Sequence, residues 1–296
     1  MQVRTATDLD VETMCDIFFA SYNDLHRRHG LSEEDPADRS WLADAIRHVL
    51  RTDPIGAVLA TDDGTPTAFA TSYLRDSYWF LSFLFVSPDA QGRGVGKALL
   101  DAVMPPESDG LTRALVVESF QPVSTGLYAG HGITPRGVRY VLTGLTDLAR
   151  LPESGSGIEV ADVTTDAIAE MSELDRRQLG FARPADHEWW LRSEMTARAY
   201  RHHGALVGYA YVDEEEIVGP ALGEDEQTAC AIVTDLIRRA EHPEALKVPV
   251  YGNNAELFRM LVRAGARIEP SDFRYFYCST DDALPSTYIH YAGYMA

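Results

Sequence analysis

Residues 79–104, WFLSFLFVSPDAQGRGVGKALLDAVM, constrain the fold of this 296-residue chain more than any other stretch. Residues 79–86 are apolar apart from one serine and rich in aromatic rings, which predicts a central strand covered on both faces. The glycine-rich loop QGRGVG, residues 91–96, follows, and apolar residues then recur at the spacing of one helix face until two prolines end the helix. The stretch therefore predicts a strand, a glycine loop and a helix in direct succession.

A glycine loop at the start of a helix predicts an anion-binding site. The first N–H groups of a helix have no partner within it, the helix dipole places partial positive charge there, and glycines let an anion approach the backbone. Arg93 and Lys97 add two full positive charges. Because the formal net charge of the chain is −19, a polyanionic ligand must be held by such a local site against the field of the whole protein.

Two common phosphate-binding motifs do not fit this loop. The P-loop pattern requires glycine where Gln91 stands and serine or threonine where Ala98 stands. The dinucleotide pattern requires glycine where Lys97 stands. The loop is therefore neither a P-loop nor a dinucleotide fingerprint.

Gln91, Gly94 and Gly96 match a third pattern, Gln/Arg-x-x-Gly-x-Gly/Ala. Residues 84–88 precede it with two apolar residues, a valine, any residue and a proline. Together they resemble the acyl-CoA-binding signature of the GNAT superfamily of N-acyltransferases. A plain glycine turn between two packed elements is the alternative interpretation.

A second match lies downstream, where GNAT proteins carry Asn-x-x-Ala-x-x-Leu-Tyr-x-x-x-Gly-Phe on a helix. Residues 121–133 read QPVSTGLYAGHGI and keep Leu127, Tyr128 and Gly132 at that spacing. Three positions depart conservatively from the motif: Gln121, Ser124 and Ile133. Two motifs in the right order support the resemblance more strongly than either does alone.

The resemblance implies an α/β GNAT fold, a mixed central sheet flanked by helices, and an N-acetyltransferase that uses acetyl-CoA. An amine would attack the thioester directly, while the pantetheine arm pairs with backbone that a bulge splays from the next strand. The Tyr128 hydroxyl would protonate the leaving thiolate, although an aromatic packing role is the alternative. The residues expected to bind acetyl-CoA are Leu84, Phe85, Val86, Gln91, Gly92, Arg93, Gly94, Val95, Gly96, Lys97, Gln121 and Ser124.

One expected catalytic group is missing. Many GNAT relatives place Glu or His on the central strand as a base, yet nothing in residues 78–86 titrates near neutral pH. Glu118, at the end of the following predicted strand, is a candidate base acting through water. A solvated acid at a strand end is the alternative interpretation of Glu118.

The second half of the chain resembles a degenerate copy of the first. Residues 151–157 have linker composition, so we predict a GNAT domain at 1–150 and a degenerate GNAT-like domain at 158–296. Aligning Pro88 with Pro220 replaces the glycine loop by GEDE, and Leu261 takes the place of Tyr128. The copy is expected to have lost the anion site, and an unrelated second domain is the alternative.

Composition and charge exclude several classes of protein. Both halves are acidic, which argues against nonspecific binding to nucleic acid or to an anionic membrane. No signal peptide or membrane-spanning stretch is recognisable, so we expect a cytoplasmic protein. The three cysteines lack metal or disulfide spacing and are expected to be reduced and mostly buried. No metal is predicted, because adjacent His202 and His203 should point to opposite faces of a strand.

Three local expectations concern the ends of elements. Asp8 can cap the first helix, and Ser32 to Asp35, followed by proline, read as the start of a second helix. In the alternative interpretation, the acidic cluster at residues 33–35 borders an acceptor site and attracts a cationic amine. The aromatic tail at residues 288–294 is expected to dock on the protein.

The sequence thus predicts an N-acetyltransferase with a small-molecule amine as its acceptor. The acceptor, the acyl-chain preference and the oligomeric state stay open, because acceptor specificity lies in loops that the sequence does not decode. The competing prediction is a noncatalytic acetyl-CoA-binding sensor or scaffold, which the missing base and the degenerate second half favour. Retention of Tyr128 favours the enzyme.

Overall fold

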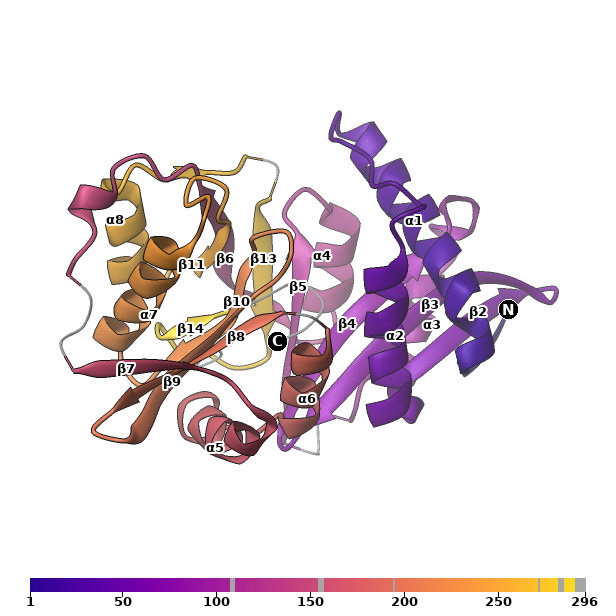
Figure 1. Ribbon diagram of the computed structural model, residues 1–296. Coiled ribbons are helices and arrows are strands. Elements are labelled where there is room, and N and C mark those ends of the chain that lie inside the picture. Colours follow the sequence, from indigo (N-terminus) through magenta and orange to yellow (C-terminus); the bar gives the residue numbers. More distant parts are fainter. Residues whose placement is uncertain (107–109, 154–156, 194, 271, 282–284, 291–296) are drawn as a thin grey trace. The chain divides into compact units, whose positions relative to one another are not determined.

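A computed structural model describes residues 1–106, 110–153, 157–193, 195–270, 272–281 and 285–290. The chain forms two compact units, unit 1 at Met1–Leu115 and unit 2 at Val116–Ala296. Each unit is a layered α/β structure with helices packed on strands (Figure 1). None of the described helices combines the length and the apolar composition needed to cross a lipid bilayer.

Unit 1 contains a mixed sheet with the strand order β1-β2-β3-β4-β5. The strands are β1 (Gln2–Thr5), β2 (Ala57–Asp62), β3 (Thr65–Arg75), β4 (Tyr78–Val86) and the first part of β5 (Thr112–Glu118). The pairs from β1 to β4 are antiparallel, whereas β4 and β5 run parallel. The buried, aromatic β4 is therefore the predicted inner strand.

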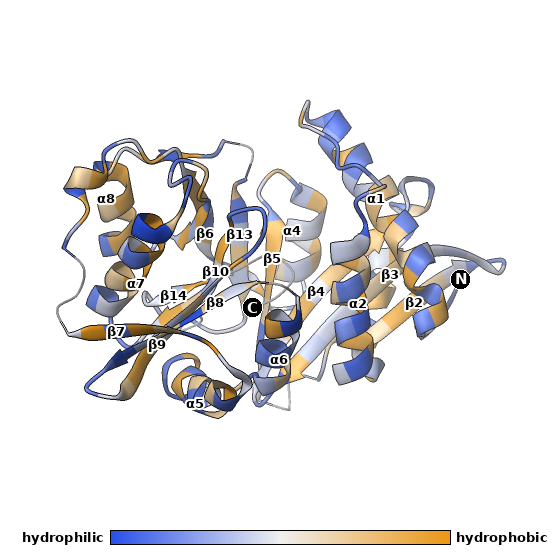
Figure 2. Cartoon of the chain, viewed as in Figure 1, coloured by the Kyte–Doolittle hydropathy of each residue, from blue (hydrophilic) through white to orange (hydrophobic). Residues whose placement is uncertain are grey.

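Three helices complete unit 1: α1 (Val11–Arg28), α2 (Ser40–Thr52) and α3 (Val95–Val103). Helices α1 and α2 cover one face of the sheet and α3 covers the other (Figure 1). Polar and apolar residues alternate along α1 and α2, as expected for helices that bury one side (Figure 2). Helix α3 buries Val95, Leu99, Leu100 and Val103 on one face, as its apolar periodicity predicts.

Two predicted helix starts in unit 1 are wrong. Asp8 lies inside a short 3₁₀ turn, and the capping box is formed by Thr7 and Asp10, whose carboxylate accepts the Thr7 N–H at 2.8 Å. Residues 32–35 are not helical, and α2 begins only at Ser40. The Asn23 side chain donates to Glu34 O and accepts from Glu34 N, both at 2.9 Å, which holds this segment in a non-helical conformation.

Unit 2 contains the remaining strands and helices. The strands are the end of β5, β6 (Thr134–Thr143), β7 (Ile158–Asp162), β8 (Thr196–His202), β9 (Ala205–Val212), β10 (Val218–Gly223), β11 (Val248–Tyr251), β12 (Arg267–Ile268), β13 (Arg274–Cys278) and β14 (Tyr288–Ile289). The helices are α4 (Pro122–Ala129), α5 (Ile168–Leu179), α6 (Pro184–Arg192), α7 (Glu226–Arg239) and α8 (Ala255–Arg263). One sheet has the order β14-β10-β9-β8-β7, and α7 and α8 pack over a buried apolar cluster beside it.

The halves of the sequence exchange strands within unit 2. Strand β6, from the first half, pairs antiparallel with β11 on one side and with β12 and β13 on the other. Both neighbours come from the second half, at positions 248–278. This pairing explains why the compact units meet at Leu115 and Val116, well before the predicted linker at 151–157, whose centre lies outside the described residues. The predicted domains at 1–150 and 158–296 follow the repeat in the sequence, whereas the compact units follow the strand pairing. The predicted limits therefore stay a prediction.

The repeat itself is visible in helices α4 and α8. Tyr128 and Leu261 are each the seventh residue of their helix. Each accepts the same closing bond, from Ile133 N to Tyr128 O at 3.1 Å and from Ala266 N to Leu261 O at 3.0 Å. Leu261 is fully buried in the apolar cluster, as expected for a copy that has replaced the tyrosine hydroxyl by packing.

We expect a fragment of residues 1–150 to self-associate or unfold. Alone, it would leave both edges of β6 without the strands from positions 248–278, and unpaired edges pair with other chains. Size-exclusion chromatography of the fragment, alone and co-expressed with residues 151–296, measures the effect. Recovery of a one-to-one complex is the expected control result, whereas a monomeric fragment with protected β6 amides would contradict the exchange.

Candidate active site

The glycine loop lies between β4 and α3 in unit 1, as predicted. Gly92 and Gly94 have φ angles of +75° and +81°, which favour glycine, and a Cβ atom at either position would meet nothing within 4 Å. Helix α3 begins at Val95, directly after Gly94. The loop therefore leaves open space in front of the helix N-terminus.

Six consecutive backbone amides at this N-terminus have no hydrogen-bond acceptor among the described residues. Within the described residues, the N–H groups of residues 92–97 donate no hydrogen bond, and the first donor of the helix is Ala98 N, 3.1 Å from Gly94 O. The N-cap residue is Gly94, so the helix has no side-chain cap. Since unpaired amides and the helix dipole both favour an anion, this loop has the properties of a phosphate cradle.

The polar side chains of the loop have defined partners. The Gln91 amide donates to Val86 O at 3.0 Å and so ties the loop to the end of β4. Lys97 Nζ lies 2.6 Å from Asp101 Oδ2, and Arg93 lies 4.0 Å from Asp62. Both cations are mostly exposed, so their present ion pairs are weak and can be exchanged for a bound anion.

Strand β4 is paired unequally along its length. It pairs with β5 from Tyr78 to Leu81, and a register shift against β3 places a bulge at Ser82. Beyond the bulge, β4 continues its ladder with β3 alone among the described pairings. Leu84, Phe85 and Val86 are partly exposed there. The strand thus has the splayed segment that the sequence predicted, one short step before the glycine loop.

Tyr128 is a buried residue of α4 in unit 2. Its ring makes an edge contact with Tyr277, with centroids 6.2 Å apart. Burial, with a smaller effect of Tyr277, raises the pKa of the Tyr128 hydroxyl above its ordinary value. The hydroxyl is therefore protonated at neutral pH. Gln121 directly precedes α4, and Ser124 lies on its first turn, both partly exposed.

Glu118, the candidate base, is held by a partner that the sequence analysis missed. Its carboxylate lies 3.1 Å from Arg274 Nε, and Arg274 also lies 3.2 Å from Asp272. The contact joins positions far apart in the sequence, so no local pattern could reveal it. The Glu118 carboxylate is therefore engaged with a side chain from the second half of the chain.

The corresponding place in the second half carries an internal anion. The Asp225 side chain accepts Thr228 N at 2.7 Å and caps α7, while Glu224 N bonds to Val207 O at 2.8 Å. Only two residues separate β10 from α7, and Pro220 lies inside β10, so the predicted alignment of Pro88 with Pro220 is wrong in register. The carboxylate cap nevertheless supports the predicted loss of the anion site.

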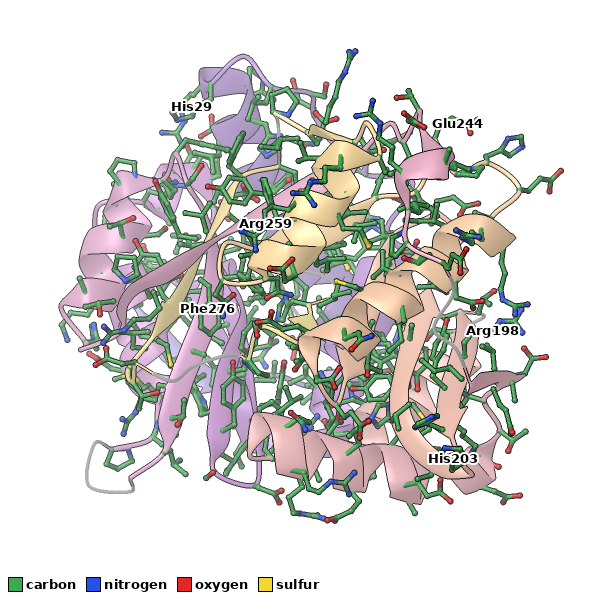
Figure 3. All side chains as sticks on the ribbon, turned by 90° about the vertical axis from the view of Figure 1, so that its left-hand side faces the viewer. His29, Arg198, His203, Glu244, Arg259 and Phe276 are labelled. Atoms are coloured by element: carbon green, nitrogen blue, oxygen red, sulfur yellow. The ribbon has the colours of Figure 1, made fainter. Side chains whose placement is uncertain are left out.

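No group of three or more His, Cys, Asp or Glu that could hold a metal ion occurs within the described ranges. The expectation about His202 and His203 is wrong, since their rings lie 4.2 Å apart. His203 has a φ of +51° in the turn after β8, which brings its ring back beside His202. His203 is labelled in Figure 3, in the turn that joins the antiparallel strands β8 and β9. The three cysteines are free thiols, two of them buried, as predicted.

Comparisons with known proteins agree with this geometry. An acetyltransferase (GNAT) family model matches residues 12–133, and an acetyltransferase (GNAT) domain model matches residues 171–274. No curated protein matches the chain.

Solved structures share the fold over the whole chain. A protein of Pyrococcus horikoshii described as an acetyltransferase is 18% identical, with a TM-score of 0.75 over 100% of this chain and 95% of that chain. A tandem GNAT protein from the clavulanic acid biosynthesis pathway is 18% identical, with a TM-score of 0.59 over 94% and 97%. A GCN5-related N-acetyltransferase of Sphaerobacter thermophilus is 17% identical, with a TM-score of 0.56 over 97% and 98%.

The two family matches account for most of the chain and fall one in each half, on either side of the predicted linker. The chain belongs to the GNAT acetyltransferase family and carries two GNAT domains in tandem.

Proposed function

We propose that the protein is an acetyl-CoA-dependent N-acetyltransferase that acetylates a small-molecule amine in the cytoplasm. The observation that carries the proposal is the run of six amides at residues 92–97, at the start of α3, that have no hydrogen-bond acceptor among the described residues, beside two glycines with open space around their Cβ positions. This arrangement suits the pyrophosphate of a coenzyme A thioester. Arg93 and Lys97 add charge at the same place, and the reaction requires no metal.

The remaining binding residues have separate roles in this proposal. The backbone of Leu84, Phe85 and Val86 would pair with the pantetheine arm in the manner of an added strand. The N–H groups of residues 92–97, with the Gln91 main chain, would hold the pyrophosphate. Gln121 and Ser124 would bind the cosubstrate from the helix that carries Tyr128. These three assignments rest on the GNAT motifs together with the local geometry of each segment.

Tyr128 is proposed as the general acid. When an amine attacks the thioester carbonyl, the C–S bond breaks and the leaving sulfur gains the electron pair, while the nitrogen loses a proton. The buried, protonated hydroxyl of Tyr128 can donate a proton to that sulfur. The acceptor must arrive as a neutral amine or lose its proton to solvent, because nothing in residues 78–86 titrates near neutral pH.

Acetyl-CoA is expected to raise the melting temperature of the full-length protein, because a ligand that binds only the native state stabilises it by mass action. Gly94→Glu should abolish this increase, since the new carboxylate would stand at the helix N-terminus. Gly204→Glu is the matched control: Gly204 also has a positive φ, +82°, and open space around its Cβ position. Equal stabilisation of the Gly94→Glu variant and the native protein would show that the cradle is misplaced.

A noncatalytic acetyl-CoA-binding protein is the second candidate. The observation that favours it is that β4, residues 78–86, carries no Glu or His, the residues that many GNAT relatives place there as a base. A thiol-release assay with a panel of amines separates the two candidates. Release that depends on the amine, with an acetylated product in mass spectrometry, supports the enzyme, whereas stabilisation by acetyl-CoA without release supports the sensor.

A further inference from the structure

The strand β10 of the second half corresponds in position to β4 of the first half. Each is followed by a helix, α7 after β10 and α3 after β4. Each also starts beside a parallel strand: β4 beside β5, and β10 beside β11 through the parallel bridge of Ile217 with Lys247. The two places can therefore be compared within one chain.

The comparison shows one difference at the splayed end. Along β4, the described ladder to β5 stops at Leu81. Along β10, the same side is filled by β14, which pairs antiparallel through Ala221 with Ile289 and through Leu222 with Tyr288. Strand β14 also packs against β11. The chain thus inserts its own extended segment where the first half leaves β4 splayed from β5.

Several hydrogen bonds fix this segment, residues 285–290, which we call the closing segment. Gly223 N, at the end of β10, donates to Thr287 O at 3.2 Å. The Asn254 side chain donates to Tyr288 O at 3.0 Å, and Arg183 donates to the Tyr288 hydroxyl at 2.7 Å. Asn254 directly precedes α8, as Gln121 directly precedes α4. The closing segment is thus bound by the residue that corresponds to a proposed acetyl-CoA ligand.

The closing segment is buried, and a carboxylate lies at the N-terminus of the helix that follows β10. Tyr288, Ile289 and His290 are each at most 1% exposed. Beyond the closing segment, the carboxylate of Asp225 already occupies the N-terminus of α7, where a pyrophosphate would otherwise lie. In the second half, the chain's own residues therefore occupy the positions that acetyl-CoA is proposed to occupy in the first half. Strand β14 stands in for the pantetheine arm, and the Asp225 carboxylate stands in for the pyrophosphate.

We propose that the second half carries a groove for an extended polypeptide, and that the closing segment occupies this groove permanently in place of a pantetheine arm. The proposal rests on the proposed function, because it compares the groove with the acetyl-CoA site. According to this proposal, each chain binds one acetyl-CoA, in its first half. The closing segment prevents a second acetyl-CoA from binding in the second half. It also explains how a domain without its cofactor remains packed, since an attached segment has a high effective concentration.

Hydrogen exchange of the full-length protein, followed by mass spectrometry, tests the proposal directly. Without ligand, the amides of residues 221–223 and 287–289 should be protected, and acetyl-CoA should leave their exchange rates unchanged. The amides of residues 82–86 should slow when acetyl-CoA binds. Isothermal titration calorimetry should give one acetyl-CoA per chain. Fast exchange of residues 221–223 without ligand, or their protection by acetyl-CoA together with two sites per chain, would overturn the proposal.

The variant Asn254→Ala removes one anchor of the closing segment without introducing a charge. Loss of this hydrogen bond should speed the exchange of residues 287–289 by about fivefold, since one such bond stabilises by roughly a factor of that size. Gln227→Ala, an exposed amide on α7, is the matched control and should leave the exchange unchanged. Equal exchange in both variants would show that Asn254 does not hold the segment. Failure of acetyl-CoA to slow residues 82–86, with residues 221–223 still protected, would refute the proposed function alone.

Discussion

The variant Tyr128→Phe is expected to lower kcat by about 10²- to 10⁴-fold, the range that positioned proton transfer contributes. The substitution keeps the ring and its edge contact with Tyr277, and removes only the hydroxyl. Burial raises the pKa of that hydroxyl, so the native donor is fully protonated at the pH of the assay. The affinity for acetyl-CoA and the melting temperature should change little, because the donor acts on the leaving sulfur.

Tyr277→Phe provides the matched control for this prediction. Its hydroxyl donates to Thr125 Oγ1 at 3.1 Å, so the variant removes a buried phenol beside Tyr128 without touching the proposed acid. We expect kcat of Tyr277→Phe to stay within about threefold of the native value. If both variants keep kcat within that limit when chemistry is rate-limiting, Tyr128 is a packing residue and the proton comes from elsewhere.

Local patterns in the sequence were sufficient for the strand, glycine loop and helix at residues 79–104. The apolar run of β4, the glycine loop and the start of α3 follow from side-chain periodicity and from the positive φ angles that glycine adopts. The repeat of α4 in α8 was also visible, because a glycine follows four residues after Tyr128 in α4 and four residues after Leu261 in α8. These features depend on residues that are close together in the chain, so the sequence displays them directly.

Contacts between distant segments could not be predicted in the same way. Residues 32–35 have the composition of a helix start, yet Asn23 holds Glu34 through two hydrogen bonds and prevents it. The alignment through Pro220 failed because proline marks a loop in the first half and lies inside β10 in the second. The exchange of β6 and the insertion of β14 depend on pairing between residues more than 60 positions apart, for which a strand pattern contains no information about the partner.

A buried polar network in unit 2 belongs to the same class of missed features. Asp175 on α5 lies 2.9 Å from Arg183 Nε and 2.9 Å from His187 Nε2, and it accepts the Tyr209 hydroxyl at 2.5 Å. Arg183 also donates to the hydroxyl groups of Tyr209 and Tyr288, and its guanidinium lies over the ring of Trp190. Asp175 and Arg183 are fully buried, so each carries a charge that only its partners compensate.

The network has a defined dependence on pH. Burial alone would raise the pKa of Asp175, but the charges and hydrogen bonds of Arg183 and His187 outweigh it and hold the pKa below its ordinary value. A carboxyl group with a lowered pKa stabilises the fold at pH values above its unfolded pKa, about 3.9. This stabilisation is lost as the pH falls through the folded pKa, so the contribution of Asp175 belongs to neutral and weakly acidic conditions.

Asp175→Ala is therefore expected to lower the free energy of unfolding by about 3–5 kcal/mol at neutral pH, because it leaves the Arg183 guanidinium buried without a counter-charge. Urea denaturation measures this loss. Glu256→Ala, which breaks the exposed pair with Arg259 on α8, is the control and should change little. The double variant Asp175→Ala with Arg183→Met should recover much of the stability, since both buried charges are then gone. An Asp175→Ala variant as stable as Glu256→Ala would mean that solvent reaches Arg183, and the α5–α6 connection would then be looser than the network requires.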